Sequence, residues 1–423
     1  MQVFKFGGAS VKDAAGVKNI TQIIKSHGKN QILVVISAMG SVTNRLAMLA
    51  RDYVRGETHC LQDFESIKAF HFDILQELIP DQLNPVYDEV ANTFVEIEWL
   101  LEEEANDPAD YLYDQIVSVG ETVSTKIVAA YMNRAGLFSI WTDARNYIKT
   151  DNNYAEANVD WEKTDREIKK HLPGFLEQGI VVTQGFIGAT SENFTSTLGR
   201  EGSDYSAAIF SACLDAESLT IWKDVPGVLN ADPKWFDETE KIDELSYHDA
   251  IELTYYGATV IHPKTIKPLQ NKHIPLWVRS FLRPEGKGTK ISEVKLPLPV
   301  PSFIFKVDQV LLSIFPKDFS FIIEENLGSI FNLFHKHRVK VNTMLNSAIS
   351  FSVSVDDSEK VDFLIKDLSQ TFNVKYNKNL ELVTIRYYNQ ATIDRVTAQK
   401  NIILEVKSRH TCQIVMKDKP LPA

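Results

Sequence analysis

The chain has 423 residues, of which 44% are hydrophobic, and it carries a formal net charge of −11. A chain of this length can bury two or three hydrophobic cores, whereas its acidic balance argues against a nucleic-acid partner. Its three cysteines, Cys60, Cys213 and Cys412, share no metal-binding or redox spacing, which predicts reduced thiols and no cysteine metal site. The sequence opens on a strand-like segment without a secretory leader, and no apolar run is long enough to cross a bilayer. We therefore expect a cytoplasmic protein that does not bind membranes.

The N-terminal segment predicts a phosphate-binding turn. Val3–Phe6 alternates like a short strand, runs into Gly7 and Gly8, and precedes a helix-like segment that begins near Val11. A strand, a glycine pair and a helix can cradle a phosphate with backbone N–H groups, and Lys5 adds a positive charge. Paired glycines are also common in ordinary turns. The chain has neither G-x-x-x-x-G-K-[ST] nor G-x-G-x-x-G after a strand, so a Walker P-loop and a Rossmann dinucleotide-binding domain are not expected.

A small polar loop follows the next apolar strand. Ile32–Ile36 is typical of a buried parallel strand, and the loop lies at its carboxyl end, where open α/β sheets bind ligands. Ser37 and Thr43 supply hydroxyl groups, although Thr43 or Asn44 could equally serve to cap the following helix.

The segment Asp52–Asp110 has Glu, Leu, Phe and Ile at helical spacing, which predicts a helical insertion whose aromatic residues lie in its core. After it, Gly120 and Glu121 precede a predicted apolar helix, Val123–Tyr131. Glu121 could receive the ammonium group of a ligand or simply complement the helix dipole.

Two further strands end in polar or glycine-rich turns. Ile180–Gln184 leads into a turn that carries Phe186 at its tip, and Leu219–Lys223 delivers Asp224 into another. Carboxyl ends of parallel strands meet at one edge of a sheet, so both turns are expected near a binding site.

The stretch Leu198–Ala208 combines two glycines with a cation and a hydroxyl group. Arg200 offers a planar fork for a carboxylate or phosphate, and Ser203 is predicted to cap the helix that follows. A glycine-rich turn that opens a helix suits anions, because unpaired N–H groups point toward the ligand. An ordinary turn and helix start remains the alternative.

Taken in chain order, these motifs resemble those of the aspartate kinases (aspartokinases) within the amino-acid-kinase superfamily. As they stand here, the motifs are K-F-G-G-A-S-V, S-A-M-G-S-V-T-N, V-S-V-G-E, T-Q-G-F-I-G, L-G-R-E-G-S-D-Y-S-A-A, W-K-D-V-P-G-V and Y-G-A-T-V-I-H-P. The resemblance implies a monofunctional enzyme that uses ATP to phosphorylate the β-carboxylate of L-aspartate to 4-phospho-L-aspartate. This reaction begins the aspartate-derived pathway to lysine, threonine and methionine.

The same resemblance implies the fold class. The expected fold is α/β, an amino-acid-kinase-like three-layer αβα sandwich with a largely parallel sheet and a helical insertion. An α+β ferredoxin-like (ACT) region is expected to follow it.

The resemblance also implies roles for individual residues. Lys5 stabilises charge on the transferring phosphoryl group, Asp204 orients Lys5, and Arg200 clamps a carboxylate of aspartate. Glu121 holds the α-ammonium group. The remaining substrate contacts are Ser37, Thr43, Phe186 and Ser203, and the ATP contacts are Lys5, Gly7, Gly8, Lys223, Asp224, Leu229, Lys234 and Thr259. Mg²⁺ is expected with ATP, because the polyphosphate is otherwise too anionic to approach a carboxylate.

Two positions depart from the family pattern. Glu201 stands where the pattern has a glycine, and its carboxylate repels a triphosphate unless it points to solvent or meets the metal ion. Thr259 stands where many members have a nucleotide-contacting lysine, for which Lys264 or Lys223 could compensate.

The predicted domains follow from the resemblance and from a proline-rich stretch near residue 300. The catalytic domain is expected over residues 1–282, with its helical insertion at about 52–112, and a linker over 283–302. A βαββαβ order predicts an ACT-like regulatory region over 303–423. Its first repeat is expected at about 303–378 and a shortened second repeat at about 379–418. The family resemblance implies a homodimer that pairs through this region.

The effector is predicted from two positions in the first repeat. Lysine-sensitive relatives have an acidic residue where this chain has Asn342, and a Ser-Glu pair where it has Ser347-Ala348. Charged partners of this kind contribute about 1.5–3 kcal/mol each. We therefore expect weak or absent lysine inhibition, with threonine a more suitable effector. A purely structural role for this region is the alternative.

Two other functional classes fit parts of the pattern. A non-catalytic amino-acid sensor is suggested by Glu201 and Thr259, but Lys5, Glu121, Arg200, Asp204 and Asp224 occur together, which argues for an enzyme. A kinase for a different carboxylate is disfavoured by the Ser37–Asn44 loop and by the ACT-like region.

Overall fold

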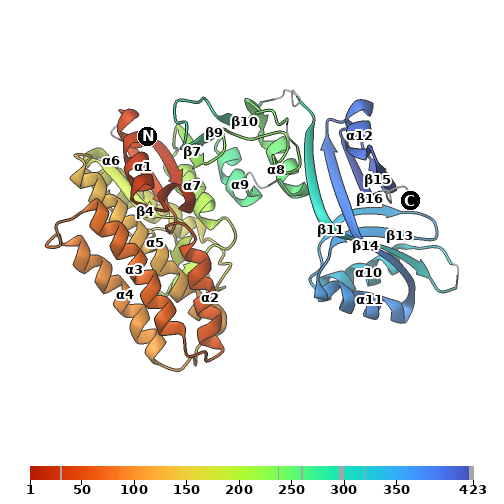
Figure 1. Ribbon diagram of the computed structural model, residues 1–423, viewed down its shortest axis with the longest axis horizontal. Coiled ribbons are helices and arrows are strands. Elements are labelled where there is room, and N and C mark those ends of the chain that lie inside the picture. The colour runs from red at the N-terminus through yellow and green to blue at the C-terminus, as the bar shows by residue number, and fades with distance from the viewer. Residues whose placement is uncertain (29–30, 237, 259–260, 295–299, 319, 419–423) are drawn as a thin grey trace. The chain divides into compact units, whose positions relative to one another are not determined.

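The computed structural model describes the chain except for residues 29–30, 237, 259–260, 295–299, 319 and 419–423 (Figure 1). The chain forms two compact units. The first comprises Met1–Val228, Asp243–Ile251 and Val260–Lys295, and the second comprises Leu229–Ile242, Glu252–Thr259 and Leu296–Ala423. None of the described helices is long and apolar enough to cross a membrane.

An eight-stranded sheet lies in the middle of the first unit, with the strand order β3-β4-β2-β1-β7-β9-β10-β8. The strands from β3 to β9 in this order are parallel, and β10 runs antiparallel to β9. A separate hairpin is formed by β5 and β6. The strands are β1 (Gln2–Phe6), β2 (Ile32–Ile36), β3 (Ser139–Trp141), β4 (Ile180–Gln184), β5 (Ile187–Ala189), β6 (Thr195–Thr197), β7 (Ser218–Lys223), β8 (Glu244–Ser246), β9 (Leu276–Ser280) and β10 (Thr289–Ser292).

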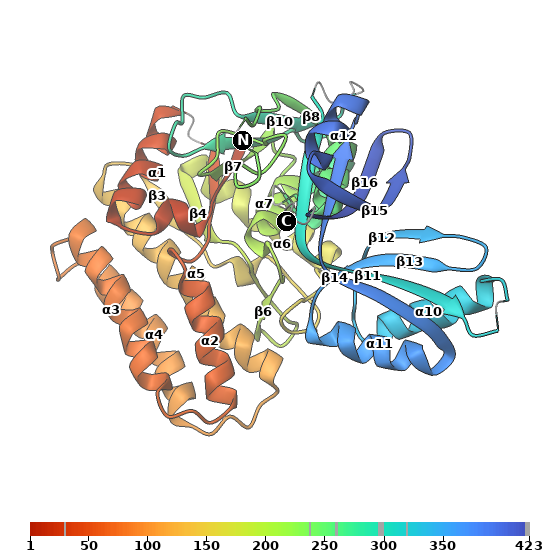
Figure 2. The same ribbon diagram turned by 45° about the vertical axis from the view of Figure 1, so that its right-hand side comes forward.

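Helices cover both faces of this sheet. On one face α5 packs against β2, β3 and β4 with α1 beside it, and on the other face α7 packs against β1, β2 and β7 with α6 and α9 beside it (Figures 1 and 2). Every residue of β2 is buried, as expected for a parallel strand covered on both faces. The helices are α1 (Ala14–Ser26), α2 (Val42–Val54), α3 (Cys60–Leu78), α4 (Val86–Glu102), α5 (Ala109–Arg134), α6 (Trp161–Gln178), α7 (Gly202–Cys213), α8 (Tyr247–Tyr256) and α9 (Pro263–Asn271), with short 3₁₀ turns η1 (Gly8–Val11) and η2 (Ala144–Asn146).

The predicted helical insertion corresponds to α3 and α4, flanked by the end of α2 and the start of α5. The two helices lie side by side, drawn in orange in Figure 2. Phe64 and Phe94 are fully buried between them and meet edge to face at 5.7 Å. The prediction that the insertion's aromatic residues form its core is confirmed for this pair.

The predicted helix Val123–Tyr131 is wrong in its start, because α5 begins much earlier, at Ala109. Gly120 and Glu121 therefore lie inside a helix and not at its head. A Cβ atom on Gly120 would lie 3.1 Å from the side chains of Ala38, Val42 and Leu46. The glycine allows α2 and the preceding loop to approach α5 closely; it does not mark a helix terminus.

The second unit contains a six-stranded sheet in the order β12-β13-β11-β14-β16-β15, with every neighbouring pair antiparallel. Helices α10 and α11 share one hydrophobic core with β11, β13 and the start of β14, whereas α12 belongs to a second core with β16. The elements are β11 (Ser302–Pro316), α10 (Glu324–Lys336), β12 (Val341–Asn346), β13 (Phe351–Asp356), α11 (Glu359–Thr371), β14 (Phe372–Arg386), α12 (Gln390–Thr397), β15 (Lys400–Lys407) and β16 (Thr411–Asp418).

The two expected repeats interleave instead of following one another. Residues 309–316 of β11 pair with 372–380 of β14, which closes an inner βαββαβ set. Residues 302–306 of β11 pair with 382–386 of the same β14, and that half of β14 also pairs with β16. Register shifts between Lys306 and Leu311 mark the transition in β11. The predicted division near residue 378 falls within β14, and residues 302–306, which were expected in the first repeat or the linker, contribute a strand to the second, outer set.

Candidate active site

A cavity of about 690 Å³ opens at the carboxyl ends of β1, β2 and β7 in the first unit. It brings together most of the residues that the sequence analysis selected: Lys5, Gly7, Gly8, Ser37, Thr43, Glu121, Phe186, Arg200, Ser203, Asp204, Lys223 and Asp224. These residues come from six separate stretches of sequence, so their convergence depends on the fold.

Three predicted nucleotide contacts are not part of this cavity as described. Leu229 and Lys234 belong to the second unit, where Lys234 lies in a turn and its N–H donates to Asp232 Oδ1 at 2.9 Å. Thr259 lies outside the described residues.

A buried ion pair lies among the residues that line the cavity. Lys5 Nζ lies 2.7 Å from Asp204 Oδ1, and Lys223 Nζ lies 3.8 Å from Asp204 Oδ2. Burial alone would raise the pKa of Asp204, but the two lysines hold it below its usual range. Asp204 thus stays ionised and fixes the Lys5 ammonium at the end of β1.

Glu121 is buried and only half satisfied. Its Oε1 accepts hydrogen bonds from Ala38 N at 3.4 Å and from Thr43 Oγ1 at 3.2 Å, whereas its buried Oε2 has no partner among the described residues. Burial raises the pKa of this carboxyl group to about 7. A buried, unpaired acceptor of this kind is costly without a ligand and suits a cation that enters the cavity.

The alternative that Thr43 or Asn44 caps the following helix is wrong. The N-cap of α2 is Ser41, so neither Thr43 nor Asn44 caps the helix. Both residues instead lie in its first turn and line the cavity.

Asp114 anchors the strand that leads to Arg200. Its fully buried carboxylate accepts hydrogen bonds from Thr197 N, Thr197 Oγ1 and Ala155 N at 2.9, 2.6 and 3.0 Å. These bonds tie α5 to β6, which ends three residues before Arg200 (200 − 197 = 3). Arg200 is exposed at the cavity and has no carboxylate within 4 Å among the described residues. Its guanidinium is therefore available to an anionic ligand.

The prediction that Ser203 caps helix α7 is wrong. Its N-cap is Glu201, and Ser203 is the second residue inside the helix. Glu201 has a left-handed backbone with φ 54°, and its Oε2 is buried without a hydrogen-bond partner in the described chain. The family pattern has glycine at this position, and glycine adopts such a backbone without steric penalty. Glu201 thus combines backbone strain with an unsatisfied carboxylate oxygen.

Replacing Glu201 with glycine is expected to stabilise the free protein by about 1 kcal/mol, because it removes the left-handed penalty and the buried oxygen together. Thermal unfolding measures this. Glu201→Ala is the matched control, since it removes the carboxylate but keeps the strained backbone. A glycine variant no more stable than the alanine variant would contradict a backbone contribution.

The structure adds lining residues that sequence reasoning missed, notably Tyr113, Trp222 and Phe281. Tyr113 precedes Glu121 by eight residues on α5, a spacing that places both on one helical face. The spacing of Tyr113 and Glu121 points to a shared face only if one helix contains both residues, and the predicted helix began after both of them. Phe281 follows β9, a strand that carried no recognised motif.

Comparison with known proteins agrees with this geometry. The model of the amino acid kinase family matches residues 1–280. Lysine-sensitive aspartokinase 3 of Escherichia coli is 30% identical over 393 residues, covering 90% of this chain and 86% of the relative. The chain belongs to the aspartokinases of the amino acid kinase family.

Solved structures of E. coli aspartokinase III resemble the whole chain. The complex with lysine and aspartate superposes with a TM-score of 0.83 at 27% identity, covering 98% of this chain and 95% of the other. The complex with aspartate and ADP gives a TM-score of 0.82 at 27% identity, with coverage of 98% and 96%. The expected fold class, an αβα sandwich followed by an ACT-like region, is confirmed for this aspartokinase.

Proposed function

We propose that this aspartokinase transfers the γ-phosphoryl group of ATP to the β-carboxylate of L-aspartate, giving 4-phospho-L-aspartate at the start of the aspartate-derived amino-acid pathway. The observation that supports this best is the charge arrangement of the cavity. The cavity is lined both by Glu121, whose Oε2 has no partner among the described residues, and by the cations Lys5, Arg200 and Lys223. Aspartate carries one cationic and two anionic groups, and ATP brings further negative charge, so both substrates complement this pattern.

Each cavity residue has a proposed part in the transfer. Glu121 Oε2 accepts the α-ammonium group of aspartate, and Arg200 clamps a carboxylate. Lys5, held by Asp204, faces the transferring phosphoryl oxygens, where positioning and charge neutralisation supply most of the catalysis. The other substrate contacts proposed are Ser37, Thr43, Phe186 and Ser203.

The nucleotide is proposed to lie along Gly7, Gly8, Lys223 and Asp224. A Cβ atom on Gly8 would lie 2.6 Å from Gly40 O, so only glycine fits this turn. The further contacts Leu229, Lys234 and Thr259 rest on the family resemblance alone.

Mg²⁺ fits the donor set of the cavity. Glu201 and Asp224 both line it, and the Oε2 of Glu201 has no hydrogen-bond partner among the described residues. Mg²⁺ is usually bound through one or two carboxylates together with substrate phosphates. When bound, the ion supplies charge neutralisation of the polyphosphate. We propose Glu201 and Asp224 as its protein ligands.

The test of this function is acyl-phosphate formation. Purified protein with Mg·ATP is expected to form a hydroxylamine-trapped hydroxamate with L-aspartate but not with L-glutamate or N-acetylglutamate. Arg200→Ala is expected to raise KM for aspartate by about 100-fold, because a charge-assisted bidentate contact is lost. No turnover with any of the three acceptors, combined with amino-acid binding, would instead support a non-catalytic sensor.

Lysine is expected to be a poor effector of this aspartokinase. Asn342, in the ACT-like unit, donates to Gln309 Oε1 and Asp356 Oδ1, each at 2.8 Å, and accepts from Lys306 Nζ at 2.7 Å. The Lys306 ammonium already lies next to Asn342, and the adjacent Asp356 Oδ1 already accepts from Asn342 and from Gln309 Nε2, so a second cation there would meet a competing cation and a carboxylate oxygen that is in use. Millimolar L-lysine is expected to leave the rate nearly unchanged, with L-threonine the better inhibitor. Inhibition by micromolar lysine would contradict this assignment.

A homodimer is proposed through the ACT-like unit. The two edge strands of its sheet, β12 and β15, expose Met344, Leu345, Ile402 and Ile403. Exposed apolar side chains on edge strands favour association with another chain.

A further inference from the structure

A second cavity in the first unit is lined by α5, the helix that carries Glu121. Its volume is about 390 Å³, at the small end of ligand pockets, and α4, α5, β3 and the segment around η2 form its walls. Glu121 and Tyr113 line the active-site cavity from α5, whereas Gln115, Ser118 and Lys126 on the same helix line the second cavity. The two cavities therefore share α5 as a wall and have no lining residue in common.

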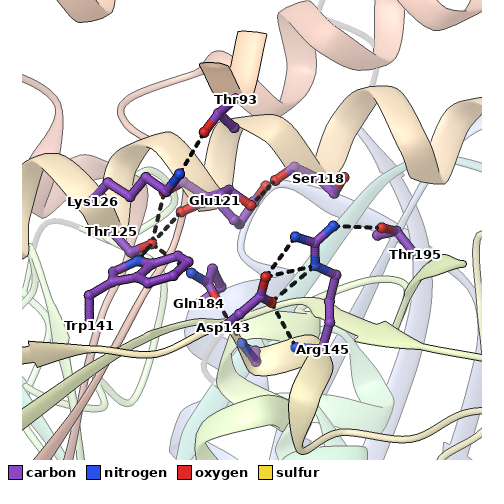
Figure 3. A network of polar contacts seen from close by, with 12 residues as sticks. Thr93, Ser118, Glu121, Thr125, Lys126, Trp141, Asp143, Arg145, Gln184 and Thr195 are labelled. Carbon is purple, nitrogen blue, oxygen red and sulfur yellow. Dashed lines mark hydrogen bonds and ion pairs between the residues drawn. The ribbon is translucent and has the colours of Figure 1, made fainter. Parts of the chain in front are cut away.

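Lys126 is a cation without a counter-ion in this second cavity. Its Nζ donates to Thr93 Oγ1 at 2.8 Å and to Glu89 O at 3.1 Å, and it lies 5.3 Å from the centroid of the Trp141 ring (Figure 3). Among the described residues no carboxylate lies within 4 Å of it. The Lys126 side chain is half-buried, and this burial lowers the pKa of its ammonium group. An ammonium has three N–H donors, so one remains for a ligand.

An acidic group without an ion-pair partner lines the same cavity. Glu96 is exposed and forms no ion pair with the described residues. The other two charges, Asp143 and Arg145, satisfy each other, because Arg145 Nη2 lies 2.6 Å from Asp143 Oδ2 and Nη1 donates to Thr195 Oγ1 at 3.1 Å. Among the described residues, the cavity is thus lined by one cation without an ion-pair partner, Lys126, and by one carboxylate without an ion-pair partner, Glu96.

We propose that this cavity binds a free α-amino acid with a neutral side chain. The amino acid's carboxylate pairs with Lys126 and its ammonium group pairs with Glu96. The rest of the lining combines apolar residues with neutral polar ones and carries no further charge, so an uncharged side chain suits the remaining space; these residues include Ile97, Leu100, Val119, Asn92, Gln115, Ser118 and Thr122. A ligand with an additional charge would lack a partner, since Asp143 and Arg145 are already paired.

Hydrogen bonds connect this cavity to the two walls of the active site. Trp141 Nε1 and Gln184 Nε2 both donate to Thr125 Oγ1 at 2.9 Å, and Thr125 Oγ1 lies 3.0 Å from the backbone oxygen of Glu121 (Figure 3). On the other side, Gln115 Nε2 donates to Thr195 O at 2.9 Å, in the strand that leads to Arg200. The cavity lining therefore includes Trp141, which is linked to Glu121, and Gln115 and Thr195, which are linked to the strand before Arg200. We infer that a ligand bound in this second cavity changes the affinity of the active site for aspartate, an inference that rests on the proposed function.

Isothermal titration calorimetry of the full chain with L-methionine and with L-leucine tests the site. Saturable binding is expected to weaken by about tenfold or more in Lys126→Met and in Glu96→Gln, because each loses one charge-assisted contact. Lys169→Met is the matched control: Lys169 is also a helical lysine, but it pairs with Asp165 at 2.9 Å on α6, outside the cavity, so its affinity should stay that of wild type. L-Lysine and L-glutamate are expected to bind more weakly than L-methionine.

Two results would overturn the site: no saturable heat with either neutral amino acid, or binding that both cavity variants retain. Binding lost only in Asn342→Ala would place the amino acid in the second unit instead. Calorimetry needs no turnover, so failure of the kinase assay and failure of this site are separate results. Repeating the titration with L-aspartate present tests the coupling, and an unchanged affinity would contradict that part. Melting temperatures close to wild type establish that the variants are folded.

Discussion

Replacing Lys5 with methionine is expected to reduce kcat by about 1,000-fold, because a fixed cation at the transferring phosphoryl group is lost. The same change leaves the buried Asp204 with Lys223, 3.8 Å away, as its remaining ion-pair partner. Breaking a buried pair in this way costs about 3 kcal/mol of folding free energy. Steady-state kinetics and denaturant unfolding measure the two effects separately.

The double variant Lys5→Met/Asp204→Asn separates catalysis from stability. The second substitution removes the negative charge of Asp204, which Lys5 no longer neutralises. The double variant should therefore recover most of the lost stability and remain inactive. Lys169→Met serves as the control, since its partner Asp165 lies on an exposed face and such pairs contribute little. A fully stable single variant, or a double variant that regains activity, would be inconsistent with the proposed role of Lys5.

Replacing Glu121 with glutamine is expected to weaken aspartate binding by about 100-fold and also to stabilise the empty protein at high pH. Burial raises the pKa of Glu121 to about 7 from the ordinary value of 4.5. A carboxyl group with a raised native pKa binds more protons in the folded state, so its stabilising contribution is complete below pH 4.5 and is lost as the pH rises through 7. The loss is on the order of 3 kcal/mol.

Unfolding of both proteins across this pH range gives the test. The wild type should lose stability between pH 4.5 and 7, and the glutamine variant should lose less over the same interval. Asp114 titrates in the same direction, since burial raises its pKa to about 6, so the difference between the two proteins is the relevant quantity. Exposed Glu77, which pairs with Lys18 at 2.8 Å, provides the control Glu77→Gln, whose profile should match the wild type. Identical pH profiles for wild type and Glu121→Gln would contradict the buried, unpaired carboxylate.

The sequence predicted those parts of the site that a strand delivers directly. Lys5, Ser37, Lys223 and Asp224 stand at or just after the ends of parallel strands, and such ends meet at one edge of the sheet. Strand periodicity and small polar loops are local signals, so the approximate position of these residues did not depend on knowing the packing.

Parts of the site that depend on packing between distant segments were not predicted correctly. Gly120 suggested a helix terminus, but the helix runs through it and the glycine accommodates α2. Ser203 looked like a cap by residue type, yet the chain enters α7 through the left-handed Glu201. Neither the approach of one helix to another nor a strained φ angle leaves a periodic pattern in the sequence.

The passage of β11 and β14 through both halves of the second unit favours one order of folding over the other. Residues 302–306 find their partners at 382–386, and an open loop of that length costs about 4 kcal/mol to close. If the inner set over 309–380 folds first, it already holds the two strands side by side, and the outer pairing then closes almost no additional loop. The outer half, including α12 and β16, is therefore expected to fold only on a completed inner half, so a cavity-forming change at Val353 in the inner core should melt both halves together.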